Sequence, residues 1–192
     1  MMELQETEGL IGKLLIAMPG IDDERFEKSV ILLCAHTEEH AMGIVLNKEM
    51  GDLRLPDLLD QLNVPIIGLL PDEPVLHGGP VGQDRGFVIH SEDFESAGAT
   101  VNITDGLRLT ATKEVLNAIA SADPPNRSRL ALGYSGWGPN QLEAELKQNV
   151  WLVADADEDI IFDTDFDEKW ERAMKKLGVS PSQLQPGTAG RA

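Results

Sequence analysis

A glycine-rich segment holds the serine that is best placed for covalent chemistry. It reads Gly133-Tyr134-Ser135-Gly136-Trp137-Gly138 and follows an apolar run, as a nucleophile elbow does. Hydrolases with that elbow carry a histidine later in the chain, and none of the four histidines here follows Ser135. The elbow pattern also needs glycine where this chain has Trp137. The alternative interpretation is a tight turn that uses the conformational freedom of glycine.

The single cysteine, Cys34, is the second candidate nucleophile. It lies in the uniformly apolar run 30–35, which predicts a strand covered on both faces. His36 lies two residues further and therefore on the same side of that strand. A reactive thiol needs exposure and a lowered pKa, and an apolar strand favours neither. We expect a buried, slowly reacting thiol and no catalytic residue, with a hydrolase that uses Ser135 or Cys34 as the alternative.

Two patterns resemble metal sites but lack the required context. His36-Thr37-Glu38-Glu39-His40 matches the H-x-x-E-H pattern, which binds zinc only from a helix. Here it joins two apolar runs, so a hairpin loop is expected. The acidic stretch that begins at Asp155 starts like a calcium loop but has Ile160 and Phe166 where glycine and glutamate are needed. No metal is expected, and without a phosphate loop or dinucleotide fingerprint no cofactor is expected either.

A pair of glycine-rich segments forms the candidate ligand site. Gly78-Gly79-Pro80 and the segment 133–138 both follow apolar strands, and glycine lets other groups approach the backbone closely. The second segment is expected to be a loop that opens a helix, where free N–H groups favour an anion. If the site exists, both segments should adjoin around an open cavity; otherwise they pack against each other. The candidate ligand-binding residues are Gly78, Gly79, Arg85, Tyr134, Ser135, Gly136 and Trp137.

Short apolar runs between turn residues predict the strands that would position these loops. They cover residues 13–18, 30–35, 42–46, 75–77, 86–90, 101–104, 107–110, 130–134, 150–154 and 160–162. Asp105-Gly106 predicts a two-residue hairpin turn. Helices are expected at 55–62, 113–121, 139–148 and 165–178, the last with Asp165 and Glu168 as a capping box.

The irregular spacing of strands and helices argues against repeated βαβ units. It predicts an α+β fold: a mixed, strongly curved or barrel-like β-sheet flanked by helices in a single domain. We expect this domain over residues 10–180, with disordered tails at 1–9 and 181–192. A chain of 192 residues is the right length for one domain.

Charge and hydropathy exclude several functional classes. The chain has 33 acidic and 16 basic residues, a formal net charge of −17, and no basic cluster, so no direct nucleic-acid binding is expected. The acidic N-terminus does not resemble a signal peptide, and no apolar run approaches the length of a membrane span. A single cysteine suits a reducing compartment. We therefore expect a cytoplasmic protein without membrane association.

Several segments together give the chain a recognisable pattern. They are residues 12–20, Phe26-Glu27-Lys28-Ser29-Val30, residues 42–48, Gly78-Gly79-Pro80-Val81, residues 85–90 and the segment 133–138. The pattern resembles the YqgE/AlgH family of uncharacterised bacterial proteins. The resemblance implies an α+β fold with a curling mixed sheet, a bacterial cytosolic location and a proposed role in transcriptional regulation. It supplies no catalytic residues.

The sequence thus favours a non-enzymatic regulatory or binding protein. Its partner would be a protein or a small molecule of unknown identity, and its surface gives no reason to expect contact with DNA.

Overall fold

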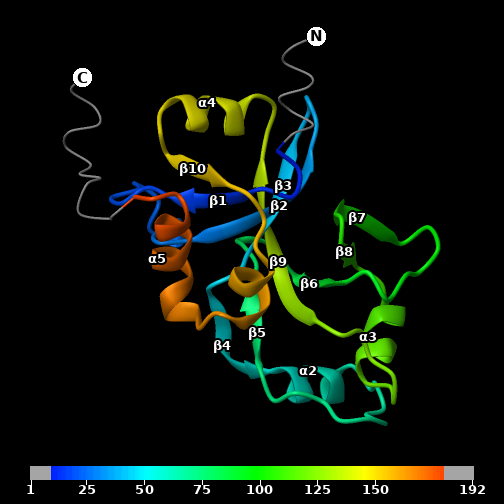
Figure 1. Cartoon of the computed structure of the whole chain (residues 1–192). Coiled ribbons are helices and arrows are strands. Elements are labelled where there is room, and N and C mark those ends of the chain that lie inside the picture. Colours follow the sequence, from blue (N-terminus) through cyan, green and yellow to red (C-terminus); the bar gives the residue numbers. More distant parts are fainter. Residues whose placement is uncertain (1–9, 180–192) are drawn as a thin grey trace. The chain divides into compact units, whose positions relative to one another are not determined.

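The computed structural model describes residues 10–179, and these form two compact units. The first contains residues 10–48 and 135–179, and the second contains residues 49–134. The predicted tails at 1–9 and 181–192 lie outside the described residues, and the predicted domain limits stay a prediction. Each unit combines a sheet with helices, so the predicted α+β class is confirmed (Figure 1).

The first unit is built on an antiparallel sheet with the order β10-β1-β2-β3-β9. Its strands are β1 (Leu14–Ala17), β2 (Val30–His36), β3 (Ala41–Val45), β10 (Trp151–Ala154) and residues 135–137 of β9 (Ser128–Trp137). A 3-10 turn (Glu24–Phe26), helix α4 (Gln141–Lys147), a π-helical turn (Asp159–Asp163) and helix α5 (Phe166–Lys176) complete the unit. Helix α5 packs on β1 and β2, and α4 packs on β10 (Figure 1).

The second unit carries a mixed sheet, because β5 runs parallel to β9 while the other pairs are antiparallel. Its strands are β4 (Glu49–Arg54), β5 (Pro74–His77), β6 (Val81–Ser91), β7 (Thr100–Thr104), β8 (Leu107–Thr110) and residues 128–134 of β9. Helices α2 (Leu55–Gln61) and α3 (Lys113–Ile119) pack their apolar faces into its core. The predicted hairpin at Asp105-Gly106 is confirmed, with Gly106 at φ 92°.

Each unit has its own apolar core. Apolar side chains from the inner faces of the strands and helices form both cores, and their removal from water stabilises the fold. In the first unit the buried cluster is Leu15, Ala17, Ile31, Leu33, Ala41, Val45, Trp137, Leu142 and Trp151. In the second it is Leu55, Leu58, Leu59, Val64, Val75, Val88, Val115, Ile119, Ala120 and Leu130.

Three local predictions are wrong. The segment 133–138 is not a loop, because β9 continues to Trp137 and helix α4 starts only at Gln141. Residues 160–162 form the π-helical turn and not a strand. The capping box at Asp165 is absent: its side chain makes no capping bond, and its backbone carbonyl accepts the N–H of Glu168 at 2.9 Å.

Candidate functional site

The two glycine-rich segments adjoin, as the ligand-site hypothesis required. The Gly78 N–H donates to the Leu132 carbonyl at 2.9 Å. A Cβ atom on Gly78 would lie 2.3 Å from the Gly133 carbonyl oxygen, and one on Gly133 would lie 2.6 Å from that of Gly79. These glycines therefore bring two backbone segments into direct contact and leave no space between them.

Arg85 and Tyr134 lie together beside this contact, in the second unit. The Arg85 guanidinium carbon is 5.6 Å from the centroid of the Phe87 ring, and Phe87 contacts Tyr134 edge to face at 5.7 Å. A Cβ atom on Gly82 would lie 3.3 Å from the Tyr134 ring and 3.4 Å from the Arg85 side chain. This group places the exposed Arg85 beside the ring of Phe87, which is buried and contacts the half-buried Tyr134.

The other three candidate residues belong to the first unit. Ser135 pairs with Gly43 across β3 and β9, and its side chain is fully buried. Trp137 is a core residue whose indole N–H donates to Glu145 Oε1 at 3.1 Å. Gly136 between them is exposed. None of the seven candidate residues lines the cavity described below.

Neither candidate nucleophile has the surroundings that covalent catalysis needs. Ser135 is 0% exposed. Cys34 is buried as predicted, its Sγ donates to the Leu32 carbonyl at 3.4 Å, and burial raises the pKa of this thiol to about 12. A thiol with that pKa is protonated at neutral pH and does not act as a nucleophile.

The H-x-x-E-H segment forms the turn between β2 and β3, as expected for a hairpin. His36 is buried and its Nε2 lies 2.5 Å from Glu143 Oε1 of α4. His40 turns to Thr37, with 3.1 Å between its Nδ1 and the threonine Oγ1. The two histidines thus have separate partners, and the helix that the zinc pattern needs is not formed here.

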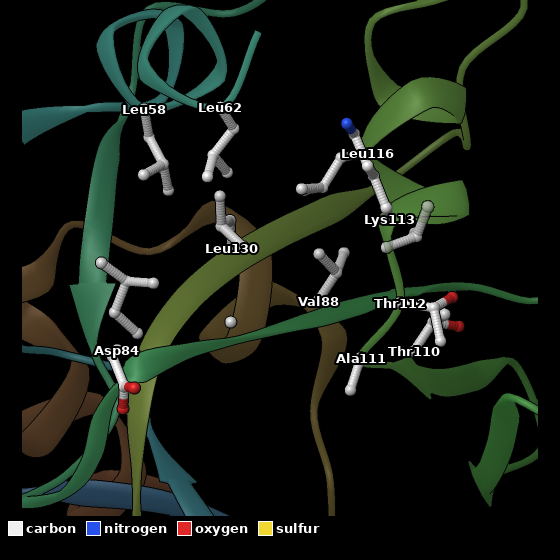
Figure 2. A pocket seen from close by; sticks show the side chains of 13 residues that line it. Leu58, Leu62, Asp84, Val88, Thr110, Ala111, Thr112, Lys113, Leu116 and Leu130 are labelled. Carbon is white, nitrogen blue, oxygen red and sulfur yellow. The ribbon is translucent and has the colours of Figure 1, made fainter. Parts of the chain in front are cut away.

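The second unit contains a cavity of about 350 Å³, which lies in the size range of small-molecule sites. Figure 2 shows Leu58 of α2, Leu62 directly after it, Leu116 of α3, Leu130 of β9 and Val88 of β6 around the same space. The apolar lining is completed by Gly86, Ala111, Val115 and Leu132. A cavity with such walls favours an apolar ligand over water.

Gly86 has a particular place in this wall. A Cβ atom there would meet only Leu130 Cδ1 at 3.7 Å, Leu132 Cδ2 at 3.8 Å and the Ala131 carbonyl at 4.0 Å, all ordinary van der Waals distances. Gly86 pairs with Leu132 across β6 and β9, but no backbone atom of β9 lies closer than 4.0 Å to this Cβ position, in contrast to Gly78 and Gly133. The missing side chain at Gly86 therefore leaves part of the cavity open.

Thr110 belongs to a buried polar chain at the edge of the cavity. His90 Nδ1 lies 2.8 Å from the Ser91 carbonyl, so this nitrogen carries the proton, and Nε2 accepts from the Thr110 hydroxyl at 2.7 Å. Thr110 in turn accepts from the Thr100 hydroxyl at 2.8 Å. Burial lowers the pKa of His90, which agrees with a neutral ring. The hydroxyl protons of Thr100 and Thr110 are both used within this chain, so it supports the wall and offers the ligand no free donor.

Two charged side chains, Lys113 and Asp84, lie at the cavity. Lys113 is the first residue of α3, and Figure 2 shows its ammonium on the side of the cavity where Leu62 and Leu116 lie. Asp84 belongs to β6, and in Figure 2 its carboxylate points away from Leu130 and the other apolar side chains.

Exposed apolar side chains continue from the cavity wall into the segment after α2. Leu62 is 42% exposed, and Ile66, Ile67 and Leu69 are 46%, 73% and 96% exposed. The segment is attached to the end of α3, because the Ile67 and Gly68 N–H groups both donate to the Ala120 carbonyl.

None of the helices within residues 10–179 has the length and hydropathy of a membrane span.

Sequence reasoning missed this cavity. Its walls come from two helices and three strands that are far apart in the chain, so no local motif marks it. The available signal was weak: Gly86 stands beside the bulky strand residues Phe87 and Val88.

Comparison with known proteins gives consistent matches over nearly the whole chain. Residues 14–182 match a protein family described as AlgH-like. A UPF0301 protein of Caulobacter vibrioides is 51% identical over 188 residues, covering 97% of this chain and 96% of that protein. One from Rhodopseudomonas palustris is 49% identical over 98% of this chain and 89% of its own length.

Two solved structures are similar to this one. The solution structure of the AlgH protein from Pseudomonas aeruginosa has a TM-score of 0.74 and 39% identity, covering 91% of this chain and 92% of that one. The crystal structure of a protein from Corynebacterium diphtheriae has a TM-score of 0.69 at 20% identity, covering 93% of this chain and 88% of that one, and shares the fold.

Proposed function

The chain belongs to the AlgH-like family, and we propose that it is a non-enzymatic binding protein whose second unit takes up a small apolar ligand. The observation that carries the proposal is the cavity of about 350 Å³ that is lined by α2, α3, β6, β8 and β9 and open to one side. Seven of its lining residues are leucine or valine. Such walls stabilise a bound ligand through the removal of its apolar surface from water.

The expected affinity follows from the buried surface. Burying about seven methylene groups at roughly 0.8 kcal/mol each gives about 5–6 kcal/mol, which corresponds to a Kd of about 0.1 mM. Ordering the ligand weakens this value, so we expect a Kd between about 0.1 and 1 mM for an eight-carbon chain.

The burial of Ser135 and Cys34 favours binding over hydrolysis. A hydrolase at either residue needs a nucleophile that the substrate can reach and a base beside it. Ser135 is 0% exposed and Cys34 is 4% exposed, and the cavity lining contains neither.

We propose further that the protein acts in the bacterial cytoplasm and that any regulatory effect is exerted through a ligand or a protein partner. The relatives described above are bacterial proteins. The net charge of −17 disfavours direct contact with nucleic acid, because the phosphate backbone is repelled.

Titration of the full chain with 1-octanol, followed by protein NMR shifts, tests the ligand proposal. We expect saturable binding with shifts concentrated near Val88, Leu116 and Leu130. Gly86→Val should fill part of the cavity and weaken binding roughly tenfold or more, because about three methylene groups of ligand lose their place.

Gly138→Val is the matched control, because a Cβ atom there meets only Gln141 Oε1 at 3.9 Å, in the first unit. It should leave the affinity unchanged. Absence of saturation in the wild type, or equal affinity in a folded Gly86→Val variant, would refute the proposal.

A further inference from the structure

We infer that the ligand of the second unit is an amphipathic anion: an apolar chain of about eight carbons with a carboxylate that pairs with Lys113. The inference rests on the proposed function and names the ligand class for the same cavity. It combines the size of the cavity, the character of its walls and the placement of the charged groups at it.

The cavity volume sets the length of the chain. A water molecule takes about 30 Å³ in the liquid, and a ligand atom with its hydrogens needs a similar volume. A cavity of about 350 Å³ therefore holds on the order of ten non-hydrogen atoms. Octanoate, with eight carbons and two oxygens, has this size.

The walls leave few polar groups for the ligand. The Thr110 hydroxyl is bound to His90 Nε2 at 2.7 Å and to the Thr100 hydroxyl at 2.8 Å, so its one proton is used within the protein and it cannot donate to a ligand. Most of the other lining residues are apolar. Apart from the buried Thr112 hydroxyl, which also lines the cavity, the polar partners for a head group are therefore Lys113 and Asp84 at its edge.

The placement of these two residues favours an anionic head group. In Figure 2 the Lys113 ammonium lies on the side of Leu62 and Leu116, while the Asp84 carboxylate points away from the apolar side chains. No hydrogen bond or ion pair within residues 10–179 engages the Lys113 ammonium. The four-carbon stem of the lysine can cover apolar ligand surface while its charge stays in water beside the carboxylate.

The experiment compares three probes of equal chain length: octanoate, 1-octanol and octylammonium, titrated into the full chain at neutral pH and low salt. The net charge of −17 acts against octanoate everywhere on the protein, so affinities are compared between variants. Lys113→Met keeps an apolar stem and removes the charge. It should weaken octanoate binding about two- to fivefold, the effect of a solvent-exposed ion pair, and leave 1-octanol unchanged.

Two further variants complete the test. Lys113→Gln should repeat the loss for octanoate, and Asp84→Asn should not cause one. The difference in octanoate affinity between the wild type and Lys113→Met should shrink at high salt, because the exposed charge of Lys113 is screened.

The outcomes separate the inference from the proposed function. If 1-octanol binds and neither Lys113 variant changes the affinity for octanoate, the anionic head group is refuted and the proposal of an apolar site still holds. Preference for octylammonium that disappears in Asp84→Asn refutes it as well and assigns a cationic head group. If none of the three probes binds, the proposed function and the inference both fail.

Discussion

The contact between the glycine-rich segments gives the sharpest test of the structure. Gly133 adopts φ +80°, and a Cβ atom there would lie 2.6 Å from the Gly79 carbonyl oxygen and 3.2 Å from that of Val81. Replacing it with alanine adds two costs: a left-handed backbone for an L-residue, about 1–2 kcal/mol, and overpacking against a backbone that cannot rotate away, about 1–3 kcal/mol. Gly133→Ala should therefore lower the free energy of unfolding by about 2–5 kcal/mol.

Gly98→Ala separates the two costs. Gly98 has nearly the same backbone angle, φ +77°, but nothing lies within 4 Å of the added Cβ. It should lose only the backbone share of about 1–2 kcal/mol. For a chain of this length each kcal/mol lowers Tm by roughly 2–4 °C.

The loss in the free energy of unfolding is measured by urea unfolding of the wild type and both variants, which are compared if they share the same m-value. Thermal unfolding gives the corresponding changes in Tm. Equal losses for Gly133→Ala and Gly98→Ala would refute the reasoning, because the close approach of the two segments would then cost nothing.

Two other predictions concern buried groups. Burial lowers the pKa of His90 from about 6.5, so below that pH the unfolded chain takes up a proton that the folded chain does not. The free energy of unfolding should therefore fall as the pH drops from about 6.5 towards the lower pKa of the folded state. His90→Gln should reduce this pH dependence, measured by urea unfolding between pH 7 and 5.5. A slope that is equal in the two proteins would contradict a buried neutral ring. Cys34 should react with a thiol reagent roughly a hundredfold or more slowly in the folded than in the urea-unfolded protein, because burial raises the pKa of the thiol to about 12; comparable rates in both states would show that the strand is accessible.

Local sequence patterns predicted the elements that local forces determine. The hairpin at Asp105-Gly106 and the strand 30–35 follow from turn chemistry and from an apolar run. The last helix runs from Phe166 to Lys176 with Gly178 at φ +72° after it, as its apolar stripe and final glycine predict. In these segments propensity and tertiary packing favour the same conformation.

The wrong predictions fall where a distant residue decides the local structure. The apolar run 160–162 looks like a strand, but the buried Lys169 of α5 donates to the carbonyl oxygens of Ile160 and Ile161 and stabilises the π-helical turn. Residues 133–137 look like a loop, but β9 continues because Ser135 pairs with Gly43 and Tyr134 pairs with Val81. Neither partner is visible from the local sequence.

The candidate site shows the same limit in a different form, because glycine has two opposite roles in the second unit. At Gly78 and Gly133 an added Cβ would lie 2.3 and 2.6 Å from backbone oxygens, so the absence of a side chain lets two backbone segments come into contact. At Gly86 the nearest atom is a leucine methyl at 3.7 Å, so the missing side chain opens a space between Leu130 and Leu132. In the sequence all three glycines follow or interrupt apolar strands and look alike. Only the atoms that face them, which come from other strands, distinguish a structural contact from the wall of a cavity. At Gly78 and Gly133 the glycine-rich segments thus form a backbone contact, whereas the cavity that we propose as the ligand site includes Gly86 in its wall.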